Sequence, residues 1–210
     1  MAQTGNLYVI AAPSGTGKTS LVKALTDTMS NLLVSISHTT RAIRPNENEG
    51  INYFFIDKTR FAEMVDKGEF LEHAQVFDNR YGTLSRWVEE TTAKGIDVIL
   101  EIDWQGHQQI KRLFPASISI FLLPPSLHDL RERLLKRNQD NETIIEKRMA
   151  DVRETVSHVD EFDYLVMNDN FDLALRDLMT IITAGRLLTK AQHRKYANLI
   201  ADLSKMTLSS

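Results

Sequence analysis

A short segment near the N-terminus has the residue types and spacing of a phosphate-binding loop. It reads Ala12-Pro13-Ser14-Gly15-Thr16-Gly17-Lys18-Thr19 and lies between an apolar run and a segment with helical periodicity. Glycines in that context let backbone N–H groups face an anion, and the helix N-terminus adds partial positive charge. Lys18 supplies a cation for the β- and γ-phosphates, and the Thr19 hydroxyl is a ligand for Mg²⁺. The segment therefore predicts a nucleoside triphosphate site.

The first position of this loop departs from the full pattern. Ala12 stands where the pattern has a glycine, which fits only if the position needs no positive φ. A strand-to-helix turn that binds no ligand is the alternative, although Lys18 and Thr19 would add nothing to such a turn.

Asp103 is the candidate carboxylate partner of the loop. It ends the apolar segment 96–103, so it is expected at the carboxyl edge of a parallel sheet, beside the phosphate loop. There it can hold Mg²⁺ directly or through water, and Glu101 points to the same face of the strand. Capping of a helix that begins near Gln105 is the alternative for Asp103, and the two roles are compatible.

A second cluster predicts a further anion site. The segment Ser37-His38-Thr39-Thr40-Arg41-Ala42-Ile43-Arg44 gathers arginines and hydroxyls in a predicted loop. Guanidinium groups match phosphate oxygens in a bidentate fashion. Ordinary solvated loop arginines are the alternative.

A third basic cluster lies between residues 130 and 148. Arg133 and Arg137 are four residues apart, so they share one helix face and repel each other unless an anion lies between them. Arg148 follows in the next predicted helix. The alternative is a solvent-facing helix, because Asp129–Arg133 and Glu132–Lys136 have the spacing of intrahelical ion pairs.

The elements that position these groups alternate along the chain. We expect strands at 7–12, 32–36, 53–56, 70–77, 96–103, 118–123 and 164–167, a turn at 79–82, and helices at 18–29, 58–67, 84–93, 105–113, 127–136, 142–159, 173–188 and after 190. Apolar strands alternating with helices predict a parallel sheet covered on both faces. The shorter elements between about 37 and 92 predict an inserted subdomain.

Composition narrows the function further. The chain has 210 residues, a formal net charge of -3 and no cysteine, which excludes disulfide frameworks, thiolate zinc sites and cysteine nucleophiles. The charge gives no global basic field, so we expect no nucleic-acid partner. The apolar runs are strand-sized and no targeting segment is visible, so we expect no membrane association and a cytoplasmic location.

The motifs, taken in order, resemble the guanylate kinase family. The resemblance runs from about residue 7 to 188 and rests on these segments: the loop 12–19, Ser37 to Arg44, Gly50-Ile-Asn-Tyr53-Phe-Phe, Phe70-Leu-Glu72-His-Ala, Tyr81-Gly-Thr83, Glu101-Ile-Asp103-Trp-Gln-Gly, Phe121-Leu-Leu-Pro-Pro-Ser126 and Asn168-Asp169. Together and in this order the motifs are highly specific for the family. Taken singly, none of them except the phosphate loop is specific.

The resemblance implies an α/β P-loop kinase with a central parallel sheet flanked by helices. It implies one domain over 1–210, with a core formed by 1–36, 93–125 and 159–210, a GMP-binding subdomain at 37–92 and a helical lid at 126–158. The implied reaction transfers the γ-phosphoryl group of ATP to GMP, and to dGMP, with Mg²⁺ as cofactor, in purine nucleotide metabolism and GMP recycling. The oligomeric state stays open, since the C-terminal helices can pack within one chain or in a homo-oligomer.

Site residues follow from the same resemblance. On the acceptor side, the GMP phosphate would be held by Arg41, Arg44, Tyr53 and Tyr81, and guanine would be read by Ser37, Glu72 and Thr83, with Asp103 close by. On the donor side, ATP would contact residues 12–19 and Asn168, and Mg²⁺ would be held by Thr19 and Asp103, partly through water. The catalytic residues would be Lys18, Arg41, Arg133, Arg137 and Arg148. The lid turn departs from the usual Gly-Arg-Gly of the family, because this chain has Lys136-Arg137-Asn138. That departure bears on lid stiffness and rate rather than on the reaction.

The chemistry of guanine supports one of these roles independently. A carboxylate at Glu72 can accept hydrogen bonds from guanine N1–H and the 2-amino group, and adenine offers neither donor there. A surface glutamate is the alternative for Glu72, and core aromatic residues are the alternative for Tyr53 and Tyr81.

Two rival functions fit parts of the sequence. One is a noncatalytic guanylate-kinase-like module that binds protein partners, although such modules typically lack an intact phosphate loop. The other is a related P-loop kinase that acts on a different phosphorylated small molecule, such as a ribose bisphosphate. The set Ser37, Glu72 and Thr83 favours a purine acceptor over the second rival.

Overall fold

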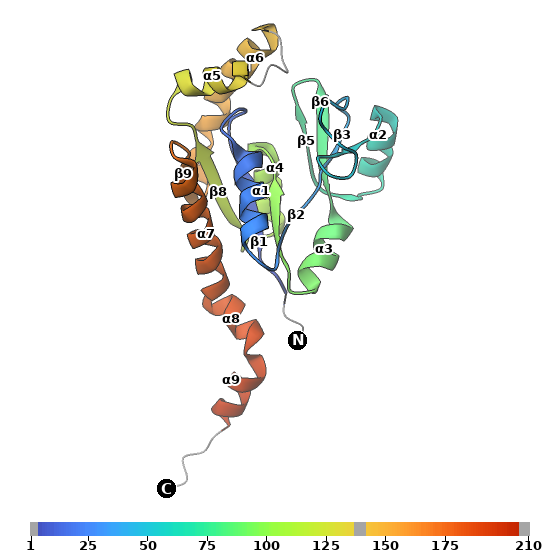
Figure 1. Ribbon diagram of the computed structural model, residues 1–210. Coiled ribbons are helices and arrows are strands. Elements are labelled where there is room, and N and C mark those ends of the chain that lie inside the picture. The colour runs from blue at the N-terminus through green and yellow to red at the C-terminus, as the bar shows by residue number, and fades with distance from the viewer. Residues whose placement is uncertain (1–3, 137–141, 206–210) are drawn as a thin grey trace.

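A computed structural model describes residues 4–136 and 142–205 of the chain. Figure 1 shows a central sheet with helices on both faces, a smaller sheet to one side, and two helices across the top. The central sheet has the strand order β2-β7-β1-β8-β9. Its strands are β1 (Leu7–Ala11), β2 (Leu32–Val34), β7 (Asp97–Glu101), β8 (Ile118–Leu123) and β9 (Tyr164–Met167), and every adjacent pair is parallel.

Burial on both faces explains the apolar sequence of the central strands. All residues of β1 are buried. Tyr8 and Ile10 pack in a cluster with α1 (Lys18–Thr28) and α7 (Phe171–Leu187), while Leu7 and Val9 pack on the opposite face with α3 (Ser85–Ala93) and α4 (Trp104–Leu113). Successive side chains of a strand point to opposite faces, so a strand covered on both sides needs apolar residues at every position. The phosphate loop therefore begins at the end of a rigid strand.

A second sheet lies within the range where the sequence predicts an inserted subdomain. It has the strand order β4-β3-β6-β5 and consists of β3 (His38–Thr39), β4 (Phe54–Phe55), β5 (Phe70–Val76) and β6 (Asn79–Leu84). Helix α2 (Lys58–Asp66) packs against β5, and Phe61 of this helix contacts the Phe70 ring at a centroid distance of 4.7 Å. Asp57 caps α2 by accepting a hydrogen bond from the Arg60 backbone N–H.

The predicted turn at 79–82 is wrong, because these residues belong to β6. The turn lies at Phe77 and Asp78, between the paired residues Val76 and Asn79, with Phe77 at φ 53°. The prediction took Gly82 as a sign of a turn. A Cβ atom at Gly82 would lie 2.9 Å from the Phe70 ring, so this glycine makes room for an aromatic side chain and does not form a turn.

The remaining helices lie within two residues of their predicted ends, except that the single helix expected after 190 is divided in two at Tyr196 and a short 3₁₀ turn ends the segment expected as the helix 142–159. They are α5 (Leu127–Lys136), α6 (Glu142–Ser157), the 3₁₀ turn η1 (Val159–Glu161), α8 (Thr189–Lys195) and α9 (Ala197–Ser204). Helix α7 begins earlier than expected because the Asn170 side chain caps it, accepting from the backbone of Asp172 and Leu173. Among the described residues, no helix is both long and apolar enough to cross a bilayer.

Candidate active site

The phosphate loop connects β1 to α1 and needs its two glycines for conformation and for space. Gly15 and Gly17 have φ of +93° and +101°, a region that L-residues rarely occupy. A Cβ at Gly15 would lie 3.0 Å from the Leu134 side chain, and one at Gly17 would lie 2.7 Å from Asn168 Nδ2. Ala12 is not among the residues with positive φ, so alanine is compatible with the first loop position.

Lys18 begins α1 at the carboxyl edge of the sheet. Its Nζ donates to the Ile102 carbonyl oxygen at 3.0 Å. Burial lowers the pKa of Lys18, and the nearby carboxylates of Glu101, Asp103 and Glu72 partly oppose that effect. The lysine thus lies near carboxylates from both sheets: Glu101 and Asp103 at the end of β7, and Glu72 in β5. It also lies next to a loop whose backbone is suited to an anion.

The carboxylate in contact with the loop threonine is Glu101. Thr19 Oγ1 donates to Glu101 Oε1 at 2.5 Å. Asp103, in contrast, is the N-cap of α4, where Oδ1 accepts from the Gly106 N–H at 3.0 Å and Oδ2 accepts from the Gln105 side chain at 3.1 Å. The capping alternative for Asp103 is therefore confirmed, and its contact with Mg²⁺ stays a prediction.

Two of the predicted lid arginines contact the phosphate loop. Arg133 donates to the Thr16 carbonyl and to the Asn168 carbonyl, each at 3.0 Å. Arg148 donates to Ser14 Oγ at 3.0 Å, and Asn168 Nδ2 donates to the Thr16 carbonyl at 2.7 Å. The structure thus brings cations from α5 and α6 to the same loop that carries Lys18.

The alternative of a solvent-facing helix holds for part of α5 only. Lys136 lies 3.7 Å from Glu132, as the spacing predicts. Asp129 instead bonds Ser126 at the start of the helix, so Arg133 is available to the loop. Arg137, the third of the expected lid arginines, lies outside the described residues, as does Asn138.

Two of the predicted guanine-reading residues lie on paired strands, and the third, Ser37, directly precedes β3. Glu72 of β5 is paired with Thr83 of β6, and the pairing of His38 with Gly82 places Ser37 opposite Thr83. Thr83 Oγ1 donates to Glu72 Oε1 at 2.5 Å. Neighbouring positions across paired strands present side chains to the same face. The sheet therefore places the three polar residues in one row.

Glu72 is a buried carboxyl group, not a surface glutamate. The residue is only 3% exposed. Burial raises the pKa of the Glu72 carboxyl group to about 7, although the hydrogen bond from Thr83 favours the ionised form. A Cβ at Gly106 would lie 2.5 Å from Glu72 Oε2, so the first turn of α4 closes one side of the carboxyl group. Sequence reasoning included Gly106 in a motif of the family but gave it no role, because a glycine in the first turn of a helix does not by itself indicate a close contact.

The predicted phosphate-binding residues gather beside this row. The Arg41 guanidinium lies 5.4 Å from the centroid of the Tyr53 ring, and that ring meets Tyr81 edge-on at 5.8 Å. Arg41 also pairs with Glu47 at 2.7 Å, and Glu47 accepts from the Arg44 backbone N–H at 2.9 Å. Sequence reasoning missed Glu47, which stands in a polar loop without periodicity.

Charges in each of the two groups of residues act on residues of the other group. Burial raises the pKa of Tyr53, and the carboxylate of Glu101, which touches Thr19 of the phosphate loop, adds to the rise. Lys18 feels the charge of Glu72 in the same way. The residues predicted to bind the two phosphates, which come from the two sheets, are therefore close enough for their charges to interact.

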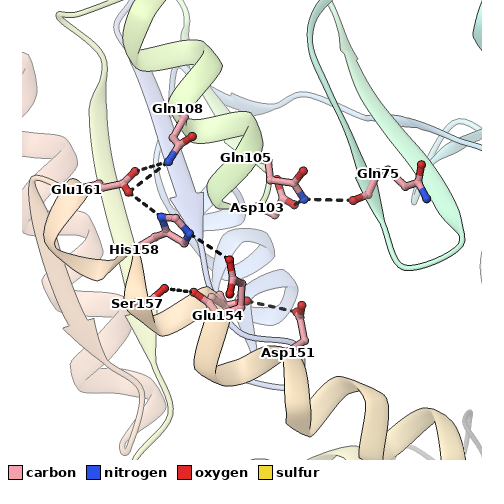
Figure 2. Close-up of polar contacts among 10 residues, drawn as sticks. Gln75, Asp103, Gln105, Gln108, Asp151, Glu154, Ser157, His158 and Glu161 are labelled. Atoms are coloured by element: carbon pink, nitrogen blue, oxygen red, sulfur yellow. Dashed lines mark hydrogen bonds and ion pairs between the residues drawn. The ribbon is translucent and has the colours of Figure 1, made fainter.

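The start of α4 joins the surrounding elements (Figure 2). The Gln105 side chain donates to the carbonyl of Gln75 in β5 at 3.1 Å. One turn later, Gln108 donates to Glu161 at 3.0 Å, and Glu161 lies 2.6 Å from the ring of His158 at the end of α6. The helix that Asp103 caps and that contains Gly106 is thus bonded to the second sheet on one side and to the turn that follows α6 on the other.

Comparison with known proteins identifies the family. Residues 4–185 match the family model described as guanylate kinase. The chain is 56% identical over 203 residues to a guanylate kinase of Saccharophagus degradans, covering 97% of this chain and 99% of the relative. It is 55% identical over 198 residues to one of Coxiella burnetii, covering 94% and 96%. The chain belongs to the guanylate kinase family.

A solved structure supports the fold. The crystal structure of guanylate kinase from Anaplasma phagocytophilum has a TM-score of 0.74 and 30% sequence identity, and 89% of each chain is covered. Members of the guanylate kinase family are nucleoside monophosphate kinases of the P-loop kinase fold, and the chain is accordingly a transferase. The predicted fold class, a central parallel sheet flanked by helices, is confirmed.

Proposed function

We propose that this guanylate kinase family member transfers the γ-phosphoryl group of ATP to GMP, and to dGMP, giving ADP and GDP in purine nucleotide metabolism and GMP recycling. One observation carries the proposal: the buried carboxyl group of Glu72, bonded to Thr83, lies within electrostatic range of the loop lysine Lys18. A guanine edge satisfies such a carboxylate, whereas adenine leaves it without donors.

The chemistry needs alignment more than proton transfer. An oxygen of the GMP phosphate attacks the γ-phosphorus, the bond between that phosphorus and the bridging oxygen of ADP breaks, and ADP leaves. The nucleophile is already an anion, so no general base and no catalytic histidine is required. Lys18, Arg133 and Arg148 offset charge on the donor side, and Arg41 does so on the acceptor side. We propose that Arg137 adds to the donor-side charge and that Asn168 lies on the adenine side.

The residues present fit a magnesium ion. The Thr19 hydroxyl and the Glu101 carboxylate lie 2.5 Å apart at the loop, and oxygen ligands of this kind suit Mg²⁺. Among the described residues no group of three or more histidine or acidic side chains is placed to hold a metal, so the ion would share ligands with the nucleotide phosphates. We propose Thr19 and, partly through water, Asp103 or Glu101 as its protein contacts. When bound, the ion would neutralise charge on the phosphates.

The wider assignment follows from the same proposal. The residues 37–92 act as the GMP-binding subdomain, 126–158 as the lid, and 1–36, 93–125 and 159–210 as the core. ATP and GMP are the partners. A cytoplasmic location, without nucleic-acid or membrane partners, fits this metabolic role, and the C-terminal helices leave room for a homo-oligomer.

An acceptor screen tests the proposed function. With ATP and Mg²⁺, ADP release is measured for GMP, dGMP, AMP, UMP and a set of ribose phosphates. We expect GMP to be the preferred acceptor by at least about 10²-fold in kcat/KM over AMP, because the buried carboxylate rejects a base without paired donors. Inactivity with every acceptor would support the noncatalytic module, and preference for a ribose phosphate would support the other rival.

A further inference from the structure

The Glu47 carboxylate bonds to two residues of its own loop, Arg41 and Arg44. Its Oε1 accepts from Arg41 Nη2 at 2.7 Å, and its Oε2 accepts from the Arg44 backbone N–H at 2.9 Å. The two oxygens of one carboxylate are thus bonded to Arg41 and Arg44, two of the four residues that the family resemblance assigns to the GMP phosphate. The Glu47 N–H closes a turn on the Arg44 carbonyl at 3.1 Å, which fixes the carboxylate relative to the loop.

The pair with Arg41 is largely removed from solvent. The side chains of Arg41 and Glu47 are only 13% and 16% exposed. Burial alone would raise the pKa of Glu47, but the hydrogen bonds from Arg41 and Arg44 hold that pKa below its usual value. The carboxylate is therefore ionised at neutral pH, and its bond to the guanidinium is charge-assisted.

The orientation of Arg41 depends on this bond because the backbone around it has little regular structure. Residues 40–52 contain no helix and no strand. Arg41 Nη1 donates to the Ala42 carbonyl at 2.9 Å, and the guanidinium lies 5.4 Å from the Tyr53 ring centroid. A guanidinium carries several N–H donors in a rigid plane, so one edge can be held by the loop while others remain for a phosphate.

We propose that Glu47 is a positioning residue, which aims the Arg41 guanidinium at the acceptor phosphate before GMP binds. The inference rests on the proposed function. An Arg41 side chain that is already oriented strengthens GMP binding, because binding then does not cost the conformational entropy of ordering that side chain. Glu47 itself touches no substrate, so its removal weakens GMP binding more than it slows the chemical step.

The substitution Glu47→Gln tests the proposal, with Glu49→Gln as the matched control. Glu49 stands in the same loop and accepts from the Phe55 backbone N–H at 2.9 Å, without contact to Arg41. For Glu47→Gln we expect the KM for GMP to rise about 10-fold, with kcat within about 3-fold and the KM for ATP unchanged. The control is expected to stay within about 2-fold of the wild type in every parameter. Glu47→Asp, which keeps the charge, is expected to recover part of the loss.

A double-mutant cycle separates positioning from a general effect on the fold. If Glu47 acts through Arg41, then Glu47→Gln in an Arg41→Ala background changes the KM for GMP less than about 2-fold. An equal effect in both backgrounds, an unchanged KM, or a lower KM, as expected of a carboxylate that competes with the phosphate, would overturn the proposal. Wild-type enzyme without GMP kinase activity would overturn the proposed function as well, whereas an active wild type with an unaffected variant refutes Glu47 alone.

Discussion

Lys18→Ala is expected to lower kcat/KM about 10³-fold while the protein stays folded. The proposed function assigns Lys18 to the β- and γ-phosphates of ATP, and loss of a charged group that stabilises the transition state removes about 4 kcal/mol. The substitution leaves the fold intact because burial already lowers the pKa of Lys18, so its charged form gains little from the folded state. Initial rates with ATP and GMP, together with thermal unfolding, measure both quantities.

Lys23→Ala is the matched control for this substitution. Lys23 lies on the same helix, and its side chain is 74% exposed and paired with Asp27 at 2.6 Å. An exposed pair of this kind contributes little to stability, so the control should keep its activity and its melting temperature within narrow limits. A Lys18→Ala variant with turnover close to that of the control would contradict the role of Lys18.

Glu72→Gln is expected to reduce kcat/KM for GMP by about 10²-fold or more and to erase most of the preference for GMP over AMP. The amide offers one acceptor where guanine presents two donors, and its NH₂ group opposes one of them. Parallel assays with both acceptors measure the effect. Glu63→Gln on the outer face of α2, where Glu63 pairs with Arg60 at 3.2 Å, controls for a loss of negative charge in the same subdomain. Unchanged selectivity would refute base reading by Glu72.

The same residue gives the enzyme a pH dependence. Burial raises the pKa of Glu72 to about 7, and only the ionised carboxylate accepts both guanine donors. The value of kcat/KM for GMP is therefore expected to rise with pH through about 7 in the wild type. The GMP phosphate also ionises, with a pKa of about 6, but this ionisation affects wild type and variant alike. The step assigned to Glu72 is therefore the one that disappears in Glu72→Gln.

Stability is expected to change in the opposite direction from activity. In the folded state the pKa of Glu72 is raised from 4.5 to about 7, so its contribution to stability is fully present below pH 4.5 and is lost as pH rises through about 7. Above that range the buried charge destabilises the protein by up to about 3 kcal/mol. Urea unfolding at pH 8 should show Glu72→Gln to be more stable than the wild type, and the difference should shrink at pH 5.

Local motifs made the donor side predictable from the sequence. The phosphate loop is one contiguous segment. Positions 15 and 17 require glycine because their φ angles are positive, so residue type and spacing alone indicate the loop. Most strand and helix positions also followed from periodicity, because each of these elements buries a face that its own sequence reveals, but the two-residue strand β3 lies in a segment predicted to be a loop. The error at 79–82 arose where a glycine serves packing against Phe70 and turn chemistry was the wrong explanation.

The acceptor side depends on contacts between segments far apart in the sequence. The row of Ser37, Thr83 and Glu72 exists only through strand register, and periodicity within one strand says nothing about its partner's register. Glu47 and the role of Gly106 stayed unnoticed for the same reason: Glu47 matters through a loop conformation, and Gly106 through the approach of α4 to Glu72. The resemblance to a family supplied the acceptor residues that pattern alone did not.

The central claim is that two nucleotide sites, one for a donor triphosphate and one for GMP, lie side by side in this chain. A crystal structure with GMP and a nonhydrolysable ATP analogue tests it most directly. The account predicts the GMP phosphate within hydrogen-bond distance of Arg41, the guanine edge on Glu72, and the triphosphate on residues 12–19. Arg41 and Arg44 pointing into solvent, with no monophosphate beside Glu72, would contradict it.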